Sequence, residues 1–181
     1  MEDQKIIGLI QNPSSRMEGF NLLVENYQER LYWHIRKMVL SHDDADDVLQ
    51  NTFIKVWKAL ENFRGDSKIY TWIYRIATNE SLSHIQKSKR TFTSDPNSDS
   101  AVSSQIQGDP YFDGDEAELF LWTAIEQLPE KQKTVFKLKY FEEMKYEDMS
   151  ELLGTSVGGL KASYHHAVNK VKDVLQKQLN Y

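Results

Sequence analysis

The sequence predicts an all-α protein built from two small helical domains joined by a flexible acidic linker. Apolar residues recur three or four positions apart on both sides of a polar middle, and we find no convincing alternating strand pattern. The middle, residues 91–115, is rich in Ser, Asp, Pro and Gly and has no period, which is typical of a linker. We therefore expect domains at 1–90 and 116–181, with 91–115 between them.

Three helices are expected in the first domain. The apolar series from Phe20 to Val39 predicts one long amphipathic helix that ends near Ser41. Ser41 can cap a second helix over about 43–61, after which Arg64–Asp66 breaks the pattern into a loop. A third helix over about 67–89 follows. The second helix has a predicted core stripe of Leu49, Phe53, Val56, Trp57 and Leu60, and the third is expected to bury Ile69, Ile73 and Ile76.

Four helices are expected in the second domain, over about 117–128, 130–141, 146–153 and 157–178. The short third helix ends at Gly154, and Thr155 and Ser156 supply a turn and a cap before the long fourth helix. A short helix, a tight glycine turn and a longer helix together match a helix-turn-helix, whose second helix enters the major groove of DNA. Its outward face would carry Gly159, Ala162, His165, His166, Asn169 and Lys170.

Bulk composition excludes several classes of protein. The chain has no cysteine, so it has neither disulfides nor thiolate metal sites. No apolar run is long enough to cross a membrane, and the acidic N-terminus is no signal peptide, so we expect a cytoplasmic protein without membrane insertion. No nucleophile–base grouping or phosphate-binding glycine loop is found, and the acids after His42 lack the register of a calcium loop. We expect no catalytic residue, no metal and no cofactor.

Charge is unevenly distributed along the chain. The formal net charge is -5, yet the linker alone carries five acids and no base, while residues 62–90 carry six bases against two acids. That basic stretch also holds four aromatic residues, Phe63, Tyr70, Trp72 and Tyr74. Cations attract phosphates and aromatic rings stack on exposed bases, so the pairing favours opened nucleic acid over closed duplex. Trp72 is as consistent with core packing, whereas Tyr74 is expected on an outward face with Thr71, Arg75 and Thr78.

The second helix carries a stripe opposite its core stripe that includes an apolar residue. Asp47, Asn51, Ile54 and Lys58 share this face, on which Ile54 would meet water. A lone exposed isoleucine is often without function. Beside Gln50 and the acids, it is equally suited to anchor a partner protein.

Four stretches in order resemble the extracytoplasmic-function sigma factors, the small bacterial subunits that give RNA polymerase its promoter specificity. They are DDADDVLQNTFIKVWKAL at 43–60, FRGDSKIYTWIYRIATN at 63–79, IEQLPEKQKTVFKLKYFEEMKYEDMSELLG at 125–154 and TSVGGLKASYHHAVNKVK at 155–172. The resemblance implies that 1–90 is a sigma region 2 domain, which binds core polymerase and melts the minus-10 element, and that 116–181 is a sigma region 4 domain, which reads the minus-35 element.

The resemblance also implies site residues and partners. The β′ clamp helices of the polymerase would meet Asp47, Gln50, Asn51 and Ile54. The loop 62–68 would capture a base flipped from the non-template strand. Minus-10 DNA would be bound by Phe63, Arg64, Ser67, Lys68, Thr71, Trp72, Tyr74, Arg75 and Asn79. Minus-35 DNA would be bound by Ser156, Gly158, Gly159, Lys161, Ala162, His165, His166 and Asn169.

The resemblance assigns partners to the rest of the chain as well. The β flap would contact the second domain, the acidic linker would occupy the basic RNA-exit path, and an anti-sigma factor would inhibit the chain. One departure concerns the recognition helix, where Ser163, His166 and Val168 stand at positions that carry arginines in many relatives. This predicts fewer phosphate contacts and a shallower salt dependence for the second domain.

Two other functions compete with transcription initiation. A stand-alone helix-turn-helix regulator would need neither the Ile54 stripe nor the aromatic basic segment. A small helical enzyme acting on a phosphorylated or nucleotide substrate through the acids near Asp46 would need metal-dependent turnover, and nothing in the residue spacing supports it.

Overall fold

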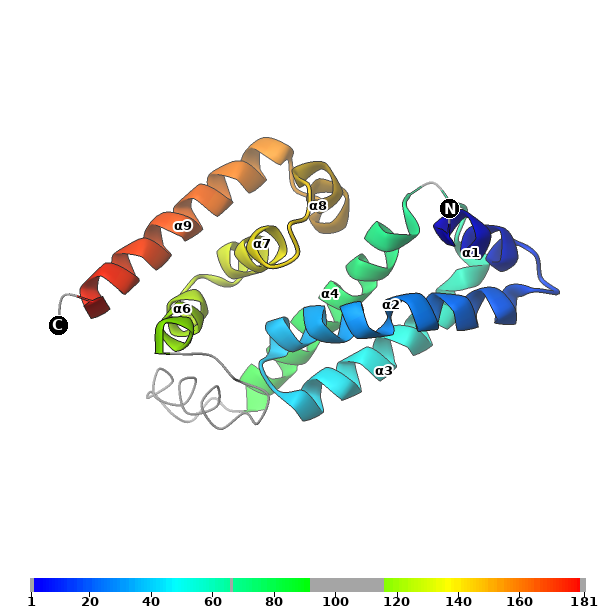
Figure 1. Ribbon diagram of the computed structural model, residues 1–181, viewed down its shortest axis with the longest axis horizontal. Helices are drawn as coiled ribbons and strands as arrows, with labels where there is room; N and C mark the ends of the chain where they lie inside the picture. Colours follow the sequence, from blue (N-terminus) through cyan, green and yellow to red (C-terminus); the bar gives the residue numbers. More distant parts are fainter. Residues whose placement is uncertain (1, 66, 92–115, 180–181) are drawn as a thin grey trace. The chain divides into compact units, whose positions relative to one another are not determined.

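The structure of the protein is a computed structural model that describes residues 2–65, 67–91 and 116–179 (Figure 1). Its described elements are all helical, so the predicted all-α class is confirmed. The chain divides between residues 90 and 91 into two compact units, which we treat separately. Most of the expected linker, residues 92–115, lies outside the described residues.

The sequence predicted most of the helices in the first unit. Its elements are α1 (Glu2–Gln11), α2 (Arg16–Val39), α3 (His42–Ala59), the 3₁₀ turn η1 (Leu60–Asn62) and α4 (Ile69–Thr91). Helix α2 ends where Leu40 adopts a left-handed conformation with φ 63°. Ser41 then caps α3, because its hydroxyl accepts the Asp44 N–H at 3.4 Å. The predicted break and cap near Ser41 are both confirmed.

Helix α1 is an element that the sequence did not predict. Ile6 and Ile10 are fully buried, and α1 packs along α2. The packing is close because Gly19 has no side chain: a Cβ there would lie 2.9 Å from the backbone nitrogen of Ile10. At the other end of α1, the Tyr27 hydroxyl donates to Asp3 at 2.7 Å. A ten-residue helix with two buried side chains offers little periodicity for sequence analysis to detect.

The buried face of α3 differs from the predicted core stripe. Val56 and Leu60 are buried as expected, but the other buried members are the small residues Ala45, Val48 and Thr52. Small side chains thus occupy most of the core-facing positions of α3. The larger side chains of Leu49 and Phe53 are therefore only half-buried, and the prediction that Trp57 is a core residue is wrong, because 38% of it is exposed.

The second unit contains the four predicted helices nearly at their predicted bounds. They are α6 (Glu116–Glu126), α7 (Glu130–Tyr140), α8 (Tyr146–Leu153) and α9 (Val157–Leu179). Gly154 ends α8 in the left-handed region, with φ 63°, a conformation that glycine adopts at low cost. A cluster of buried residues joins α6, α7 and α9, consisting of Ala124, Ile125, Leu128, Phe136, Ala167 and Val171.

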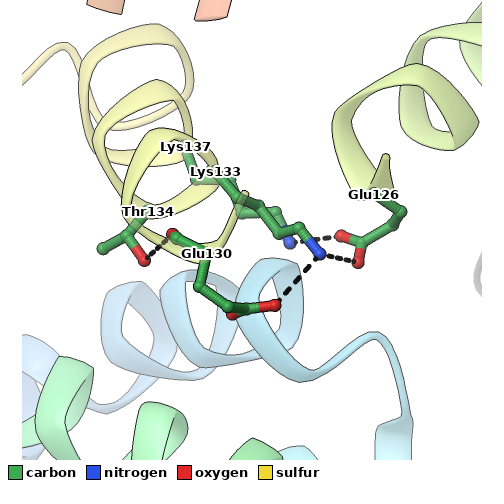
Figure 2. A network of polar contacts seen from close by, with 5 residues as sticks. All are labelled: Glu126, Glu130, Lys133, Thr134 and Lys137. Atoms are coloured by element: carbon green, nitrogen blue, oxygen red, sulfur yellow. Dashed lines mark hydrogen bonds and ion pairs between the residues drawn. The ribbon is translucent and has the colours of Figure 1, made fainter. Parts of the chain in front are cut away.

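Two lysines on α7 and one glutamate on α6 form a buried network (Figure 2). One carboxylate oxygen of Glu126 receives the Lys137 ammonium at 2.7 Å, and the other receives Lys133 at 2.7 Å. Burial alone would raise the pKa of Glu126, but the two ammonium groups more than offset it and hold that pKa below its usual range. Burial lowers the pKa of Lys137, although Glu126 opposes this shift. The network ties α6 to α7 across the Pro129 turn.

Candidate functional site

An apolar groove opens on the surface of the first unit between α2 and α3. Met17 and Phe20 line it from α2, and Gln50, Phe53, Ile54 and Trp57 line it from α3. The Phe20 ring packs edge-on against Trp57, with centroids 5.1 Å apart. Met17 is 57% exposed and Ile54 is 46% exposed, so large apolar side chains are left facing water here. An exposed apolar patch of this kind is typical of a protein-binding surface.

The residues expected to contact a partner protein extend from this groove along α3. Asp47, Gln50, Asn51 and Ile54 are all exposed, as the helical wheel predicted. The sequence missed most of the groove, since Phe53 and Trp57 were assigned to the core and Met17 was not considered. The small residues Ala45 and Thr52 were the available signal, because a face built on them leaves the larger rings at its edge.

The loop between η1 and α4 is anchored in the core on one side. Phe63 is 8% exposed and packs on Trp72, with ring centroids 4.7 Å apart. Gly65 has φ 81°, which places a turn at the predicted break, and its neighbour Arg64 is exposed. Asp66 lies outside the described residues.

The expectation of an open aromatic face on α4 is wrong. Tyr74 is 2% exposed and lies 4.9 Å from the His34 ring of α2, while Thr71 is 1% exposed. Thr78, expected on the same face, is fully buried and forms a hydrogen bond with His34 Nε2 at 3.0 Å. The His34 contacts place α2 over this face of α4. Because the opposite face, which carries the isoleucines, is also buried, little of the first half of α4 is exposed to solvent.

These corrections divide the residues expected to bind minus-10 DNA into two groups. Four are buried and cannot offer open ring faces or hydroxyls in this conformation: Phe63, Thr71, Trp72 and Tyr74. Five are exposed or partly exposed: Arg64, Ser67, Lys68, Arg75 and Asn79. The accessible group is polar and contains three cations, so its chemistry suits phosphates and base edges better than ring stacking.

The second helix of the helix-turn-helix presents the expected face to solvent. The eight residues expected to contact minus-35 DNA are all exposed: Ser156, Gly158, Gly159, Lys161, Ala162, His165, His166 and Asn169. Ser156 acts as a cap, because its hydroxyl accepts the Gly159 N–H at 3.2 Å. Farther along, the Asn169 amide donates to His165 Nε2 at 3.0 Å.

Two other kinds of site were sought in the described residues. Within them, no group of three or more His, Asp or Glu side chains is arranged to hold a metal ion. None of the described helices combines the length and the apolar character that a bilayer span requires.

Comparison with known proteins relates both units to one family. The family description Sigma-70 region 2 matches residues 23–91, and Sigma-70, region 4 matches residues 121–171. The RNA polymerase sigma-H factor of Pseudomonas aeruginosa is 33% identical, over 98% of this chain and 96% of its own length. The ECF RNA polymerase sigma-E factor of Haemophilus influenzae is 30% identical, over 97% of this chain and 96% of its own. The chain belongs to the extracytoplasmic-function sigma factors.

Solved structures agree with this sigma factor in fold. CnrH, solved in complex with the cytosolic domain of CnrY, superposes with a TM-score of 0.70 at 21% identity, covering 98% of this chain and 99% of CnrH. The sigma factor RpoE of Bartonella quintana, solved in complex with the anti-sigma factor NepR, gives a TM-score of 0.67 at 21% identity, covering 87% of this chain and 96% of its own.

Membership in this family defines the class of function. A sigma factor is not an enzyme; it binds core RNA polymerase and directs it to promoter DNA. Its work is binding. The region 2 match begins at Leu23, so α1 and the first residues of α2 lie outside it.

Proposed function

We propose that the first unit docks on a helical element of core polymerase through the apolar groove and the polar stripe beside it. The observation that carries this proposal is the continuity of the two features: Gln50 and Ile54 belong to the expected contact stripe and also line the groove. Apolar anchors in the groove would supply affinity, while Asp47 and Asn51 at its margin would fix orientation. The β′ clamp helices are the partner that the family implies.

A substitution that places a charge in the apolar groove tests this docking. Ile54→Asp should weaken binding to cognate core polymerase by about 10- to 100-fold, since loss of an interface anchor costs roughly 2 kcal/mol or more. Trp33→Asp is the matched control, because Trp33 is 43% exposed and does not line the groove. Both variants are checked for unchanged helical content. Equal affinity of wild type and Ile54→Asp for core polymerase would refute the docking site.

We propose further that the loop 62–68 and the start of α4 capture the opened non-template strand of the minus-10 element. Support comes from the accessible cations Arg64, in the loop, and Arg75, on α4, and from the exposed Asn79 one turn farther along α4. The contact between the buried rings of Phe63 and Trp72 would anchor the loop. Extruding a base costs a few kcal/mol, which a preformed pocket can offset.

Promoters for this test come from run-off transcription of fragmented DNA from the source bacterium with its own core enzyme. Asn79→Ala and Arg75→Ala should slow promoter opening and leave affinity for core polymerase unchanged. Opening is measured by the permanganate reactivity of unpaired thymines. Normal opening by both variants would remove these residues from the strand-capturing surface.

The second unit, in this proposal, reads the minus-35 element as duplex through the exposed face of α9 and also contacts the β flap. Lys161 is the one cation among the eight candidate contacts, so few phosphate contacts are available. The affinity of the second unit for duplex should therefore fall less steeply with salt than that of an arginine-rich relative. A slope as steep as the relative's would contradict this assignment.

An anti-sigma protein is proposed as a third partner, and the cytoplasm as the location. Two structural neighbours support the partner, since CnrH was solved with the cytosolic domain of CnrY and RpoE with the anti-sigma factor NepR. If the inhibitor covers the groove, Ile54→Asp will weaken its binding together with that of core polymerase.

The acidic linker is proposed to occupy the RNA-exit path of the polymerase. Neutralising its five aspartates should then weaken initiation. Unchanged abortive and run-off transcription would refute this role.

A further inference from the structure

Helix α1 contacts the loop that the proposed function assigns to strand capture. The side-chain amide of Gln11 donates to the carbonyl oxygen of Arg64 at 3.4 Å. The same amide lies beside Gly65, where a Cβ would come within 3.4 Å of it and within 3.9 Å of the Ile7 side chain. At Gly65, therefore, no side chain of the loop separates the turn from α1.

A second contact joins α1 to the start of the loop through Arg16. Its guanidinium donates from Nη1 to the Glu61 carboxylate at 3.1 Å and from Nε to the carbonyl oxygen of Ile10 at 3.4 Å. Arg16 thus connects the last turn of α1 with η1, which leads directly into the loop. Glu61 is exposed, so this ion pair adds little to the free energy of unfolding, but it orients η1 relative to the end of α1.

Helix α1 is itself firmly attached, and so it can act as a fixed support. Ile6 and Ile10 are buried, Gly19 allows close backbone approach, and the Tyr27 hydroxyl holds Asp3. The Ser15 hydroxyl adds a bond to the Leu9 carbonyl oxygen at 3.0 Å. A terminal helix with this many attachments does not behave as a fraying end.

A fixed support matters for a loop that receives an extruded base. Phe63 anchors one side of the loop in the core, whereas the Arg64–Gly65 side is exposed and would otherwise have several conformations. Ordering a loop at the moment of binding subtracts from the binding free energy, and extrusion already consumes part of it. Contacts that order the loop beforehand therefore increase the affinity for the captured strand.

We propose that Gln11 and Arg16, which precede the region 2 match, are positioning residues for strand capture. They hold the Arg64–Gly65 turn against α1 in the shape that accepts a base. The inference rests on the proposed role of the loop 62–68, and it adds α1 as one wall of that site.

The test uses holoenzyme assembled from the full chain and cognate core polymerase on a promoter found by run-off transcription. Gln11→Met keeps the size of the side chain but loses the donor, and Gln11→Glu places a carboxylate against the Arg64 carbonyl. Both should reduce affinity for the single-stranded minus-10 oligonucleotide by about 3- to 10-fold, the value of one hydrogen bond, with Gln11→Glu the more severe. Arg16→Met should act in the same direction.

The controls separate positioning from folding. Gln4→Met changes an exposed glutamine on the same helix and should leave strand affinity unchanged. Gln11→Lys, which retains an N–H donor, should recover part of the loss. Affinity for core polymerase should be the same in every variant. An equal loss of core affinity would mean that the first unit is misfolded, and would overturn the positioning role.

Gly65→Ala distinguishes failure of this inference from failure of the proposed function. Alanine is strained at φ 81°, so the substitution distorts the turn directly. If Gly65→Ala weakens strand capture and the Gln11 variants do not, α1 has no positioning role. If Gly65→Ala has no effect either, the loop does not capture the strand, and both proposals fail.

Discussion

The two units differ in the polar groups that they bury. In the first, two of the most deeply buried polar contacts are hydrogen bonds, one between His34 and Thr78 and one from Thr52 to the Val48 carbonyl, while the cation Arg36 is less deeply buried, at 9% exposed. In the second, Lys137, which is 2% exposed, is neutralised by a glutamate on the preceding helix. A buried ion pair is strongly destabilised when one member is lost, whereas a neutral hydrogen bond costs less to break. The second unit should therefore be the more sensitive to a single polar substitution.

The largest effect is expected from Glu126→Gln, which leaves Lys137 buried without its counter-charge. The free energy of unfolding of the second unit should fall by about 3–5 kcal/mol. Hydrogen exchange of α7 amides in the full chain measures it. Glu130→Gln is the control, because that side chain is 45% exposed and approaches Lys133 only at 3.5 Å, so a change of about 0–1 kcal/mol is expected. Equal effects of the two variants would show that the buried pair is no more sensitive than an exposed one, which is the premise of the comparison between the units.

Acid should reproduce part of this loss in the wild type. The folded pKa of Glu126 lies below its ordinary value of 4.5, because the two lysines outweigh the effect of burial. The stabilisation is then complete above about pH 4.5 and is lost as the pH falls through the lower folded value. Exchange of α7 amides between pH 6 and 3 should show this decline. Glu126→Gln should show less of it, and parallel pH profiles would contradict the assignment.

In the first unit, Thr78→Val should lower the free energy of unfolding by about 1–3 kcal/mol. Valine has the same shape but cannot bond to Nε2 of the buried His34. Thr52→Val is a matched control, since Thr52 is equally buried but donates only to a carbonyl of its own helix. Urea unfolding of the full chain, followed by α2 and α4 amide exchange, should show a larger loss for Thr78→Val. The reverse order would mean that the His34 bond contributes little.

The smallest effect is expected from Tyr27→Phe, at about 0.5–1.5 kcal/mol. The substitution removes the bond to Asp3, whose carboxylate can turn to water instead. The loss should appear as faster amide exchange in α1 and not in α3. Uniform acceleration across the first unit would show that α1 unfolds only together with the rest.

The second unit could be predicted almost completely from sequence because its signals are local. Pro129 marks the start of α7, Gly154 ends α8, and α9 has a regular apolar stripe. The helices of the first unit were also largely predicted, but two of their faces were not. The buried face of α3 consists largely of small residues such as Ala45 and Thr52, and the buried Tyr74 packs on His34, forty residues earlier. Periodicity along one helix carries no information on such contacts.

The candidate sites likewise contain features that the sequence predicts and features that it does not. Exposure of the α3 stripe and of the α9 face was predicted, since each is opposite an apolar stripe. The groove and the α1 support were not, because both require residues from separate helices to be brought together, as Met17 and Trp57 are. Aromatic residues near basic ones suggested stacking, but in a unit of this size rings such as Trp72 are also needed for the core.

The hydrogen bond between Asn169 and His165 on α9 has a consequence for promoter discrimination. The amide nitrogen can only donate, so Nε2 of His165 accepts in this bond. If α9 reads the minus-35 element as proposed, both side chains can contact base edges without breaking this bond, because it does not use the second amide N–H and the carbonyl oxygen of Asn169 or Nδ1 of His165. The bond would then hold the two side chains in one arrangement before DNA arrives, so less conformational freedom would be lost on binding. A pair fixed in this way would favour promoters whose base edges match that arrangement.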